Sequence, residues 1–166
     1  MTKSAIINSN SEQETIEMGE TLGALLTAGD IISMIGDLGT GKTRMAKGIV
    51  SRALKVSVDE IISPSFTIVN RYEGPLTIDH ADLYRVGPDA IEELGLMDLL
   101  DSECSLLIEW ASEDSPILTS ELRITFDWGD SDNSRILTFE YLGCGTWNSR
   151  FEKFMEDTAA LGTVFA

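Results

Sequence analysis

Short apolar runs alternate with segments of helical periodicity along this chain of 166 residues. The apolar or alternating runs, which have the length of strands, are residues 3–8, 30–35, 63–74, 75–84, 104–110, 121–128 and 134–143. Apolar residues recur with helical spacing in four other segments, which are residues 11–29, 44–54, 87–102 and 147–155. Because strands and helices alternate, the pattern predicts an α/β fold with a mostly parallel sheet flanked by helices on both faces.

Local signals place several element boundaries. Ser11, followed by Glu14 three residues later, predicts a capping box at the start of the first helix. The dipeptide Gly74-Pro75 predicts a hairpin between two strands, and the turn-rich segment 129–133 (GDSDN) predicts a second hairpin late in the chain. We expect the second hairpin to add antiparallel strands at one edge of the sheet.

The length of the chain favours one domain. With 43% hydrophobic residues, 166 residues are enough for one core and too few for two ordinary domains. We expect a single domain over residues 1–157 and a tail over residues 158–166 that frays, because this tail has no clear docking face. The amino-terminal segment is polar, and no apolar run approaches the roughly 18 residues that cross a bilayer. We therefore expect a cytoplasmic protein with no membrane partner.

Composition limits the class of partner. Twelve Lys and Arg against 28 Asp and Glu give a net charge of −16, which excludes a large basic face for nucleic acid. The negative charge indicates either a large partner with a basic patch or simple solvation, and both interpretations stay open. Cys104 and Cys144 lack metal-ligand spacing and predict reduced thiols, and the single histidine, His80, excludes a site that needs several imidazoles.

The segment GDLGTGKT, residues 36–43, fits the phosphate-loop pattern G-x-x-x-x-G-K-[ST]. Its glycines let the backbone approach phosphates, and consecutive N–H groups at the start of a helix favour anionic oxygens. Lys42 is expected to reach the β- and γ-phosphates, and the Thr43 hydroxyl to bind Mg²⁺. Because a strand and a helix are predicted independently on either side, the segment predicts a P-loop NTPase-like fold. The predicted nucleotide-binding residues here are Gly36, Asp37, Leu38, Gly39, Thr40, Gly41, Lys42 and Thr43.

Acidic residues at strand ends complete the predicted chemistry. A phosphate loop needs a carboxylate on a neighbouring strand to hold the metal or its water. Glu109 follows four apolar positions in LLIEW and is the first candidate. Asp82 and Asp79 compete as the second candidate, because spacing alone does not separate them. We interpret His80 as a hydrogen-bonded structural residue rather than a base.

Two further features stay open on the residues alone. The hydroxyl-rich turn Ser63-Pro64-Ser65 is either a loop that senses the γ-phosphate or a simple connection into a strand, and the second interpretation is favoured without further information. Arg85 either stabilises charge on the transferred phosphoryl group or pairs with a surface carboxylate, which is the commoner case.

Four motifs, GDLGTGKT, SPSFTIV, HADLYR and LIEWA, occur in one order along the chain. This ordered set resembles the bacterial TsaE family, also called YjeE, over roughly residues 11–111. The resemblance implies a single P-loop ATPase domain with ATP and Mg²⁺ as cofactors. It also implies two partner proteins, TsaB and TsaD, of which TsaD transfers a threonylcarbamoyl group to the adenosine next to the anticodon of ANN-decoding tRNAs. The tRNA is then contacted only through these partners, and hydrolysis is weak in the isolated chain.

The resemblance also implies roles for individual residues. Lys42, Asp82 and Glu109 correspond to catalytic positions, and Thr43, Glu109 and Asp82 to positions at the metal. The D-L-Y-R motif favours Asp82 over Asp79. Thr15 lies where the family has a Thr near the adenine. The segment 63–66 matches the family's S-P-[ST]-[FY] pattern, which favours its interpretation as a γ-phosphate-sensing switch over that of a simple connection.

Some positions depart from the family pattern. Arg44 follows the loop where the family often has Thr or Ser, but it lies outside the phosphate-facing set. After Trp110 the chain reads ASEDSP, and the tail is longer than the family core requires. The carboxy-terminal part therefore does little to locate the rest of the adenine pocket.

Two other functions are alternatives to a partner-dependent ATPase. A small-molecule P-loop kinase usually has a basic lid over the phosphates, whereas the seven Arg of this chain are scattered singly. A GTP-dependent switch uses N-K-x-D and D-x-x-G, and neither pattern occurs in the sequence. The kinase is the main alternative.

Overall fold

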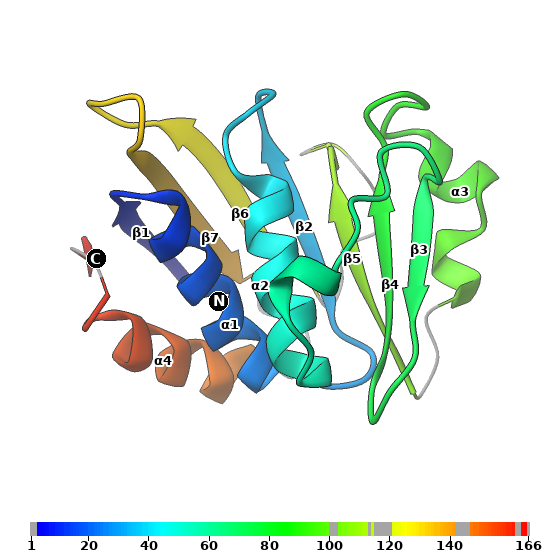
Figure 1. Cartoon of the computed structure of the whole chain (residues 1–166), viewed down its shortest axis with the longest axis horizontal. Coiled ribbons are helices and arrows are strands. Elements are labelled where there is room, and N and C mark those ends of the chain that lie inside the picture. The colour runs from blue at the N-terminus through cyan, green and yellow to red at the C-terminus, as the bar shows by residue number, and fades with distance from the viewer. Residues whose placement is uncertain are drawn as a thin grey trace.

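The computed structural model describes residues 3–99, 103–112, 114, 121–141, 147–161 and 164–165. Within these residues the strands are β1 Lys3–Ser9, β2 Ile31–Gly36, β3 Val69–Tyr72, β4 Thr77–Asp82, β5 Cys104–Glu109, β6 Glu121–Trp128, β7 Arg135–Tyr141 and β8 Val164–Phe165. The α-helices are α1 Glu12–Leu25, α2 Lys42–Leu54, α3 Ala90–Glu93 and α4 Trp147–Thr158, and the 3₁₀ helices are η1 Val58–Glu60 and η2 Leu96–Leu99. Figure 1 shows their arrangement.

The described strands form one mixed sheet in the order β3-β4-β5-β2-β6-β7-β1-β8. Strands β4, β5, β2 and β6 pair in parallel in the middle of the sheet. The hairpin β3–β4 leaves β3 antiparallel at one edge, and β7, β1 and β8 pair antiparallel towards the other. The α/β class and both hairpins are confirmed. The prediction of a mostly parallel sheet with one antiparallel edge is wrong, because each hairpin gives one strand to the parallel set and turns the other antiparallel.

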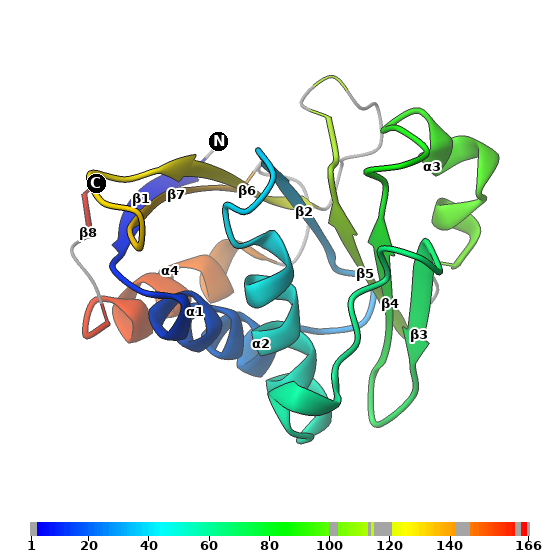
Figure 2. The same cartoon turned by 45° about the horizontal axis from the view of Figure 1, so that its top comes forward.

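Helices lie on both faces of the sheet, but they cover them unequally (Figure 2). Helices α1, α2 and α4 share one core with the inward side chains of β1, β2, β6 and β7. A smaller core on the other face joins α3 and η2 to β2, β4 and β5. Among the described residues, no helix combines the length and the apolar composition needed to cross a bilayer.

The start of α1 follows the predicted cap only in part. Ser11 Oγ accepts a hydrogen bond from the Glu14 N–H at 3.1 Å, as a capping residue does. The Glu14 carboxylate accepts from the N–H of Asn10 at 2.7 Å, one residue before the cap. The Glu14 carboxylate therefore caps the N–H of Asn10 rather than that of Ser11. Helix α1 nevertheless begins directly after Ser11, as the pattern predicts.

Two described residues of the carboxy-terminal tail pair with the sheet, while the expectation that the tail over residues 158–166 frays stays a prediction. Val164 and Phe165 pair with Ile7 and Ile6 of β1 as the short strand β8. The physical reason is that β1 pairs on its other side with β7, so its outer edge offers unpaired N–H and C=O groups to any nearby extended segment.

Glycines let α1 and α2 pack unusually close together. A Cβ atom built on Gly48 of α2 would lie 2.2 Å from the carbonyl oxygen of Ile16, and one on Gly19 of α1 would lie 2.4 Å from that of Met45. Real Cβ atoms do not approach backbone oxygen so closely, so no side chain fits at either position without moving a helix. This contact fixes the first turn of α1 beside the first turn of α2.

We predict that Gly48→Ala destabilises the protein by at least ~2 kcal/mol, because overpacking against backbone outweighs the gain that Ala normally brings to a helix. Urea unfolding of the variant measures the change. Lys47→Ala on the same helix is the matched control and should change stability by less than ~0.5 kcal/mol. A Gly48→Ala protein as stable as the wild type would contradict the close packing.

Candidate functional site

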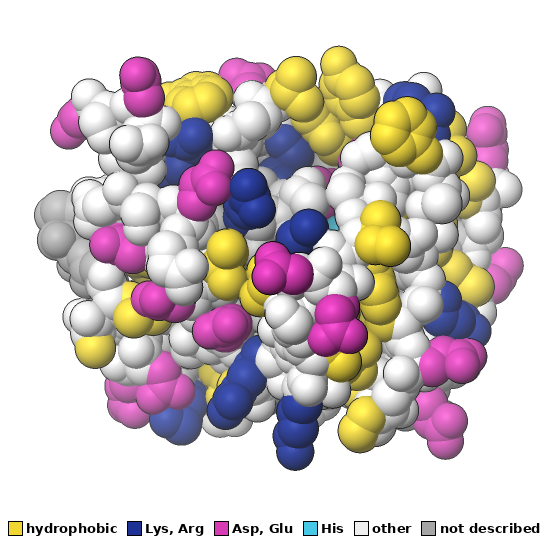
Figure 3. Space-filling model, viewed as in Figure 1, with side chains coloured by type: hydrophobic (Ala, Val, Ile, Leu, Met, Phe, Trp, Pro, Cys, Tyr) yellow, Lys and Arg dark blue, Asp and Glu magenta, His cyan; other side chains and the backbone are white. Residues whose placement is uncertain are grey.

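A cleft of about 490 Å³ lies at the carboxyl ends of the parallel strands. Strand β2 leads into the glycine-rich loop at one side of it, and the ends of β4 and β5 supply carboxylates. The first turn of α1 and the β6–β7 turn complete its walls. Figure 3 shows Lys and Arg side chains grouped around the amino-terminal end of α2 on this face. The position agrees with the general rule that open α/β sheets bind ligands outside the carboxyl ends of their strands.

The loop between β2 and α2 has the conformation that its glycines permit. Gly39 and Gly41 have φ values of 80° and 106°, a region that side chains with a Cβ rarely adopt. Gly41 is also the residue before α2, which is long enough to present several unpaired N–H groups at its start. Thr40 Oγ1 donates to the Asp37 carbonyl at 2.7 Å and holds the turn. The loop therefore has the backbone geometry of an anion site.

Lys42 lies over this loop and is almost fully buried, with 4% of its surface exposed. Its Nζ donates to the carbonyls of Gly36 at 2.6 Å and Asp37 at 2.8 Å, and it lies 3.9 Å from the centre of the Trp110 ring. Burial lowers the pKa of Lys42 below its ordinary value, although the carboxylates of Glu109, Asp82 and Asp37 act to raise it. A cation held this way attracts an anionic ligand strongly, because little water screens it.

Glu109, at the end of β5, joins three elements. Its side chain is buried, and Oε2 accepts from the Thr43 hydroxyl of α2 at 2.8 Å. Its other oxygen, Oε1, lies 2.7 Å from Nε2 of His80 on β4. The structure thus brings together the predicted loop threonine and the predicted strand-end acid. His80 is hydrogen-bonded and buried, as predicted.

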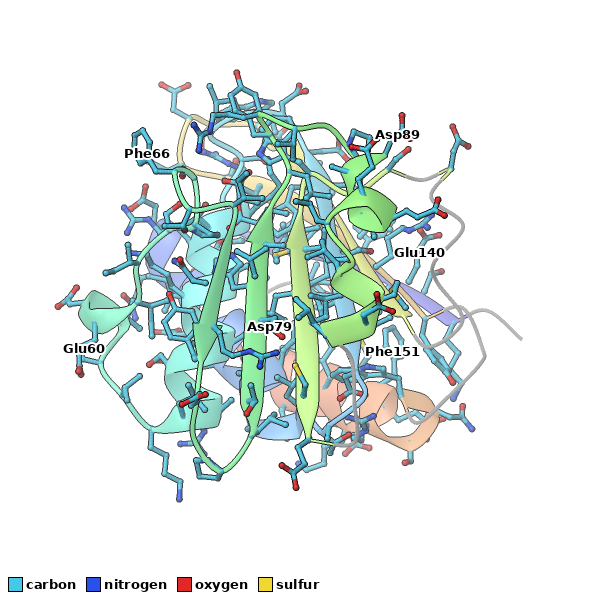
Figure 4. The ribbon with its side chains drawn as sticks, turned by 90° about the vertical axis from the view of Figure 1, so that its right-hand side faces the viewer. Glu60, Phe66, Asp79, Asp89, Glu140 and Phe151 are labelled. Atoms are coloured by element: carbon cyan, nitrogen blue, oxygen red, sulfur yellow. The ribbon has the colours of Figure 1, made fainter. Side chains whose placement is uncertain are left out.

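The register of β4 and β5 separates the two competing aspartates. Asp82 is paired directly beside Glu109 and faces the cleft. Its Oδ1 accepts from the N–H of Tyr84 at 2.9 Å. Asp79 lies further back along β4, away from the exposed loop that carries Phe66 (Figure 4). Of the two, only Asp82 lines the cleft.

Asp79 belongs instead to a buried cluster. Arg71 of β3 donates to both of its oxygens, at 2.8 and 2.7 Å, and the Cys104 thiol donates at 3.0 Å. Burial acts to raise the pKa of Asp79, but the hydrogen bonds from Arg71 and Cys104 outweigh it and hold the pKa below its ordinary value. Burial and Asp79 raise the pKa of Cys104 to about 12, so the thiol stays protonated. Cys144 lies outside the described residues.

The oxygen atoms at the bottom of the cleft suit a hard divalent cation. Thr43, Asp82 and Glu109 offer a hydroxyl and two carboxylates, the ligand types that Mg²⁺ prefers. Among the described residues, no group of three or more His, Cys, Asp or Glu side chains is placed to hold a metal ion by itself. Mg²⁺ at this position would therefore need phosphate or water oxygens as well, as it does in nucleotide sites.

Thr15 lies in the wall formed by α1 and is 2% exposed. Its hydroxyl is 2.7 Å from Ser9 Oγ, and its methyl carbon would lie 3.6 Å from a Cβ on Gly41. The structure thus places Thr15 against the loop. Its proximity to an adenine stays a prediction.

The segment 63–66 and Arg85 meet at the mouth of the cleft. The hydroxyls of Ser63 and Ser65 are 2.6 Å apart, and Phe66 is 87% exposed. Arg85 donates to the Phe66 carbonyl at 2.7 Å rather than to a surface carboxylate, which was the commoner expectation. The segment therefore has a defined contact with the end of β4, and its interpretation as a switch stays a prediction.

Two aromatic residues and one arginine at the cleft were missed by reasoning from the sequence. Trp110 has a positive φ of 62°, which turns its ring onto Lys42, and it also packs on Tyr84 with ring centroids 4.7 Å apart. Arg135 reaches from β7 to the Gly39 carbonyl at 3.1 Å. The position of Trp110 directly after Glu109 was the one available signal, whereas nothing local marks Arg135.

We predict that Arg71→Ala lowers the free energy of unfolding by ~1–3 kcal/mol at pH 7, because the buried Asp79 carboxylate loses two donors. The pKa of Asp79 is depressed in the folded wild type, so the stabilisation is present above the unfolded pKa and disappears as the pH falls through the folded one. The difference in the free energy of unfolding between variant and wild type should therefore hold from pH 7 to about pH 4 and narrow below that pH, in urea titrations carried into the acid range.

Lys153→Ala, which removes an exposed pair with Asp157, serves as the control and should leave the stability nearly unchanged, because water and salt screen such a pair. A gap for Arg71→Ala that stayed constant with pH would show that Asp79 is not the group stabilised.

Comparisons with known proteins give a consistent result. A sequence model of the family described as "Threonylcarbamoyl adenosine biosynthesis protein TsaE" matches residues 9–137. Proteins named "tRNA threonylcarbamoyladenosine biosynthesis protein TsaE" are similar to this chain. The one from Bacillus subtilis is 33% identical over 148 residues, 87% of this chain and 87% of the relative. The one from Rickettsia bellii is 39% identical over 104 residues, 61% of this chain and 71% of the relative.

The corresponding protein of Nostoc sp. is 41% identical over 86 residues, 51% of this chain and 52% of the relative, so the match spans about half of that protein. Among solved structures, the crystal structure of Bacillus subtilis YdiB superposes with a TM-score of 0.73 at 28% identity. The superposition covers 96% of this chain and 97% of YdiB. The likeness therefore extends over nearly the whole fold.

Proposed function

Because the chain belongs to the TsaE family of threonylcarbamoyl adenosine biosynthesis proteins, we propose that it is a partner-dependent P-loop ATPase of that pathway. It binds and hydrolyses Mg-ATP to support a TsaB–TsaD complex in threonylcarbamoylation of the adenosine next to the anticodon of ANN-decoding tRNAs. The observation that carries the proposal is the arrangement of Lys42, Thr43 and Glu109 around one glycine-rich loop.

The phosphates of ATP are bound by the loop and Lys42. The N–H groups at the start of α2 and the buried ammonium provide positive potential where the overall charge of −16 would otherwise repel a polyanion. Lys42 now donates to two backbone carbonyls that lie within the loop itself. A flexible side chain exchanges such neutral acceptors readily for phosphate oxygens, which form stronger, charge-assisted bonds.

Thr43, Asp82 and Glu109 hold the metal side of the site. Mg²⁺, when bound with ATP, neutralises charge on the phosphate oxygens. The Thr43 hydroxyl would offer its oxygen to the metal, and the carboxylates of Asp82 and Glu109 would hold it directly or through its water ligands. A carboxylate at this position also orients the attacking water, and the adjacency of Asp82 and Glu109 in the sheet register supports such a role for the pair.

Hydrolysis by the isolated chain is slow because the arginines at the cleft are engaged elsewhere. Arg44 pairs with Glu12 at 3.3 Å, Arg85 donates to the Phe66 carbonyl and Arg135 donates to the Gly39 carbonyl. A phosphoryl-transfer site gains a large part of its rate from a cation that contacts the transferred group. We propose that binding of TsaB–TsaD completes this part of the site. The same three arginines come from separate elements and form no lid, which favours an ATPase over a small-molecule kinase.

We predict that Lys42→Ala weakens Mg-ATP binding at least ~10-fold and abolishes turnover, because a charge-assisted contact worth ~1.5–3 kcal/mol is lost. Glu109→Ala should retain more of the binding and lose most of the turnover. Fluorescent-nucleotide titration and phosphate release measure the two effects. Lys47→Ala, a lysine on the same helix outside the cleft lining, is the matched control. Normal hydrolysis by Glu109→Ala in the full complex would refute its assigned role.

We also predict that TsaB–TsaD accelerates ATP turnover of the wild-type chain by ten-fold or more. Phosphate release is compared for the chain alone, for TsaB–TsaD alone and for the mixture at saturating ATP. Fast turnover by the chain alone that the partners leave unchanged would contradict partner dependence. Stable phosphoryl transfer to a metabolite in the same assay would favour the kinase.

A further inference from the structure

His80 is the single histidine of the chain, and its side chain is fully buried on β4, two residues before Asp82. Its Nε2 lies 2.7 Å from Glu109 Oε1, and the Glu109 side chain is only 2% exposed. Polar side chains are buried at this depth only when hydrogen bonds compensate for lost water. The pair therefore has a defined geometry rather than a mobile surface contact.

The surroundings of the imidazole assign its proton. Within the described residues, His80 Nδ1 is buried and has no hydrogen-bond partner. A neutral imidazole carries its proton on one nitrogen. A proton on Nδ1 would leave a buried N–H unpaired and direct the Nε2 lone pair at a carboxylate, so both costs are avoided when Nε2 carries it. His80 consequently donates to Glu109.

The two oxygens of Glu109 then have separate donors. Oε1 accepts from His80, and Oε2 accepts from the Thr43 hydroxyl at 2.8 Å. The Thr43 hydroxyl can bind a metal through its oxygen lone pairs while its hydrogen still points to Glu109. The bond from His80 comes from a strand in the core and reaches the other oxygen, Oε1. Together the two donors hold the carboxylate in one orientation, with Oε2 towards Thr43.

We propose that His80 is a positioning residue: its Nε2–H fixes the Glu109 carboxylate so that Oε2 faces Thr43 and the metal side of the cleft. This inference rests on the proposed ATPase function and deepens it by naming what prepares the metal site. Removal of a group that orients a ligand of a metal site in this way typically lowers metal affinity or activity by about 10- to 100-fold.

A purely structural role for His80 makes a different prediction. If the imidazole only fills space in the core, its replacement lowers stability. It then weakens nucleotide binding to the same extent with and without metal. If it positions Glu109, the replacement weakens the metal-dependent step and leaves metal-free nucleotide binding intact. The two roles are therefore separated by comparing nucleotide affinity with and without metal.

The experiment compares His80→Leu, which removes the donor at similar volume, with His80→Gln, whose amide N–H reaches a position close to that of Nε2. Arg71→Ala is the control, because it removes the partner of Asp79, a buried carboxylate on the same strand as His80 but away from the cleft. For each variant we measure urea stability, the affinity for fluorescent ATP in EDTA, and the Mn²⁺ concentration that gives half-maximal binding of the metal by electron paramagnetic resonance with ATP present. Turnover with TsaB–TsaD is the last readout.

We expect His80→Leu to raise the half-maximal Mn²⁺ concentration and lower turnover by about 10-fold or more, with ATP affinity in EDTA within about 2-fold of the wild type. His80→Gln should recover most of the loss. In a Glu109→Gln background, His80→Leu should add little, because the group it positions is already changed. Should His80→Leu fail to fold, His80→Asn, whose shorter amide does not reach the position of Nε2, replaces it as the variant without the donor, alone and in the Glu109→Gln background.

The inference is overturned if His80→Leu binds Mn²⁺ and turns over ATP like the wild type, or if its losses match those of Arg71→Ala at equal stability. It is also overturned if His80→Leu weakens Mn²⁺ binding and lowers ATP turnover by as large a factor in the Glu109→Gln background as in the wild type. Failure of the proposed function looks different, because then the wild type itself shows no metal-dependent ATP binding in the same series.

Discussion

One buried carboxylate organises the cleft of this protein. Glu109 at the end of β5 accepts hydrogen bonds from Thr43 at the start of α2 and from His80 on β4, so it joins three segments that are far apart in the sequence. A carboxylate with 1% exposure is tolerated only with such partners, because burial of an unpaired charge is very costly. The positions of the loop, the strand ends and the imidazole are therefore not independent of one another.

The rest of the fold supports this arrangement from two sides. The parallel register of β4 and β5 sets Asp82 beside Glu109, so both acids face one cleft. On the other side, Gly19 and Gly48 allow α1 to approach α2 until their backbones touch, which holds Thr15 against the phosphate loop. The antiparallel edges, including the β1–β8 pair, widen the sheet, while Asp82 and Glu109 both come from its parallel middle. The site is thus built on rigid elements, and its mouth is formed by loops.

How much of this was predictable depends on whether the signal was local. The loop Gly36–Thr43 and the acid Glu109 were predicted because each has a short motif next to a strand. The sheet edges were not, because pairing of β1 with β7 joins residues more than a hundred positions apart and leaves no local pattern. Spacing alone left Asp79 and Asp82 open, and the choice of Asp82 came from the D-L-Y-R resemblance, with which the strand register agrees. The contact of Trp110 with Lys42 depends on a backbone conformation at residue 110 that composition does not reveal.

The central claim is that the loop amides and the Lys42 ammonium bind the phosphates of Mg-ATP. Isothermal titration calorimetry of the wild-type chain with Mg-ATP, with and without TsaB–TsaD, tests it most directly. The account predicts a saturable heat that corresponds to one nucleotide per chain and that disappears when the nucleotide is replaced by adenosine, which has no phosphates for the loop to bind. An absence of heat with folded protein, even when both partners are present, would contradict it.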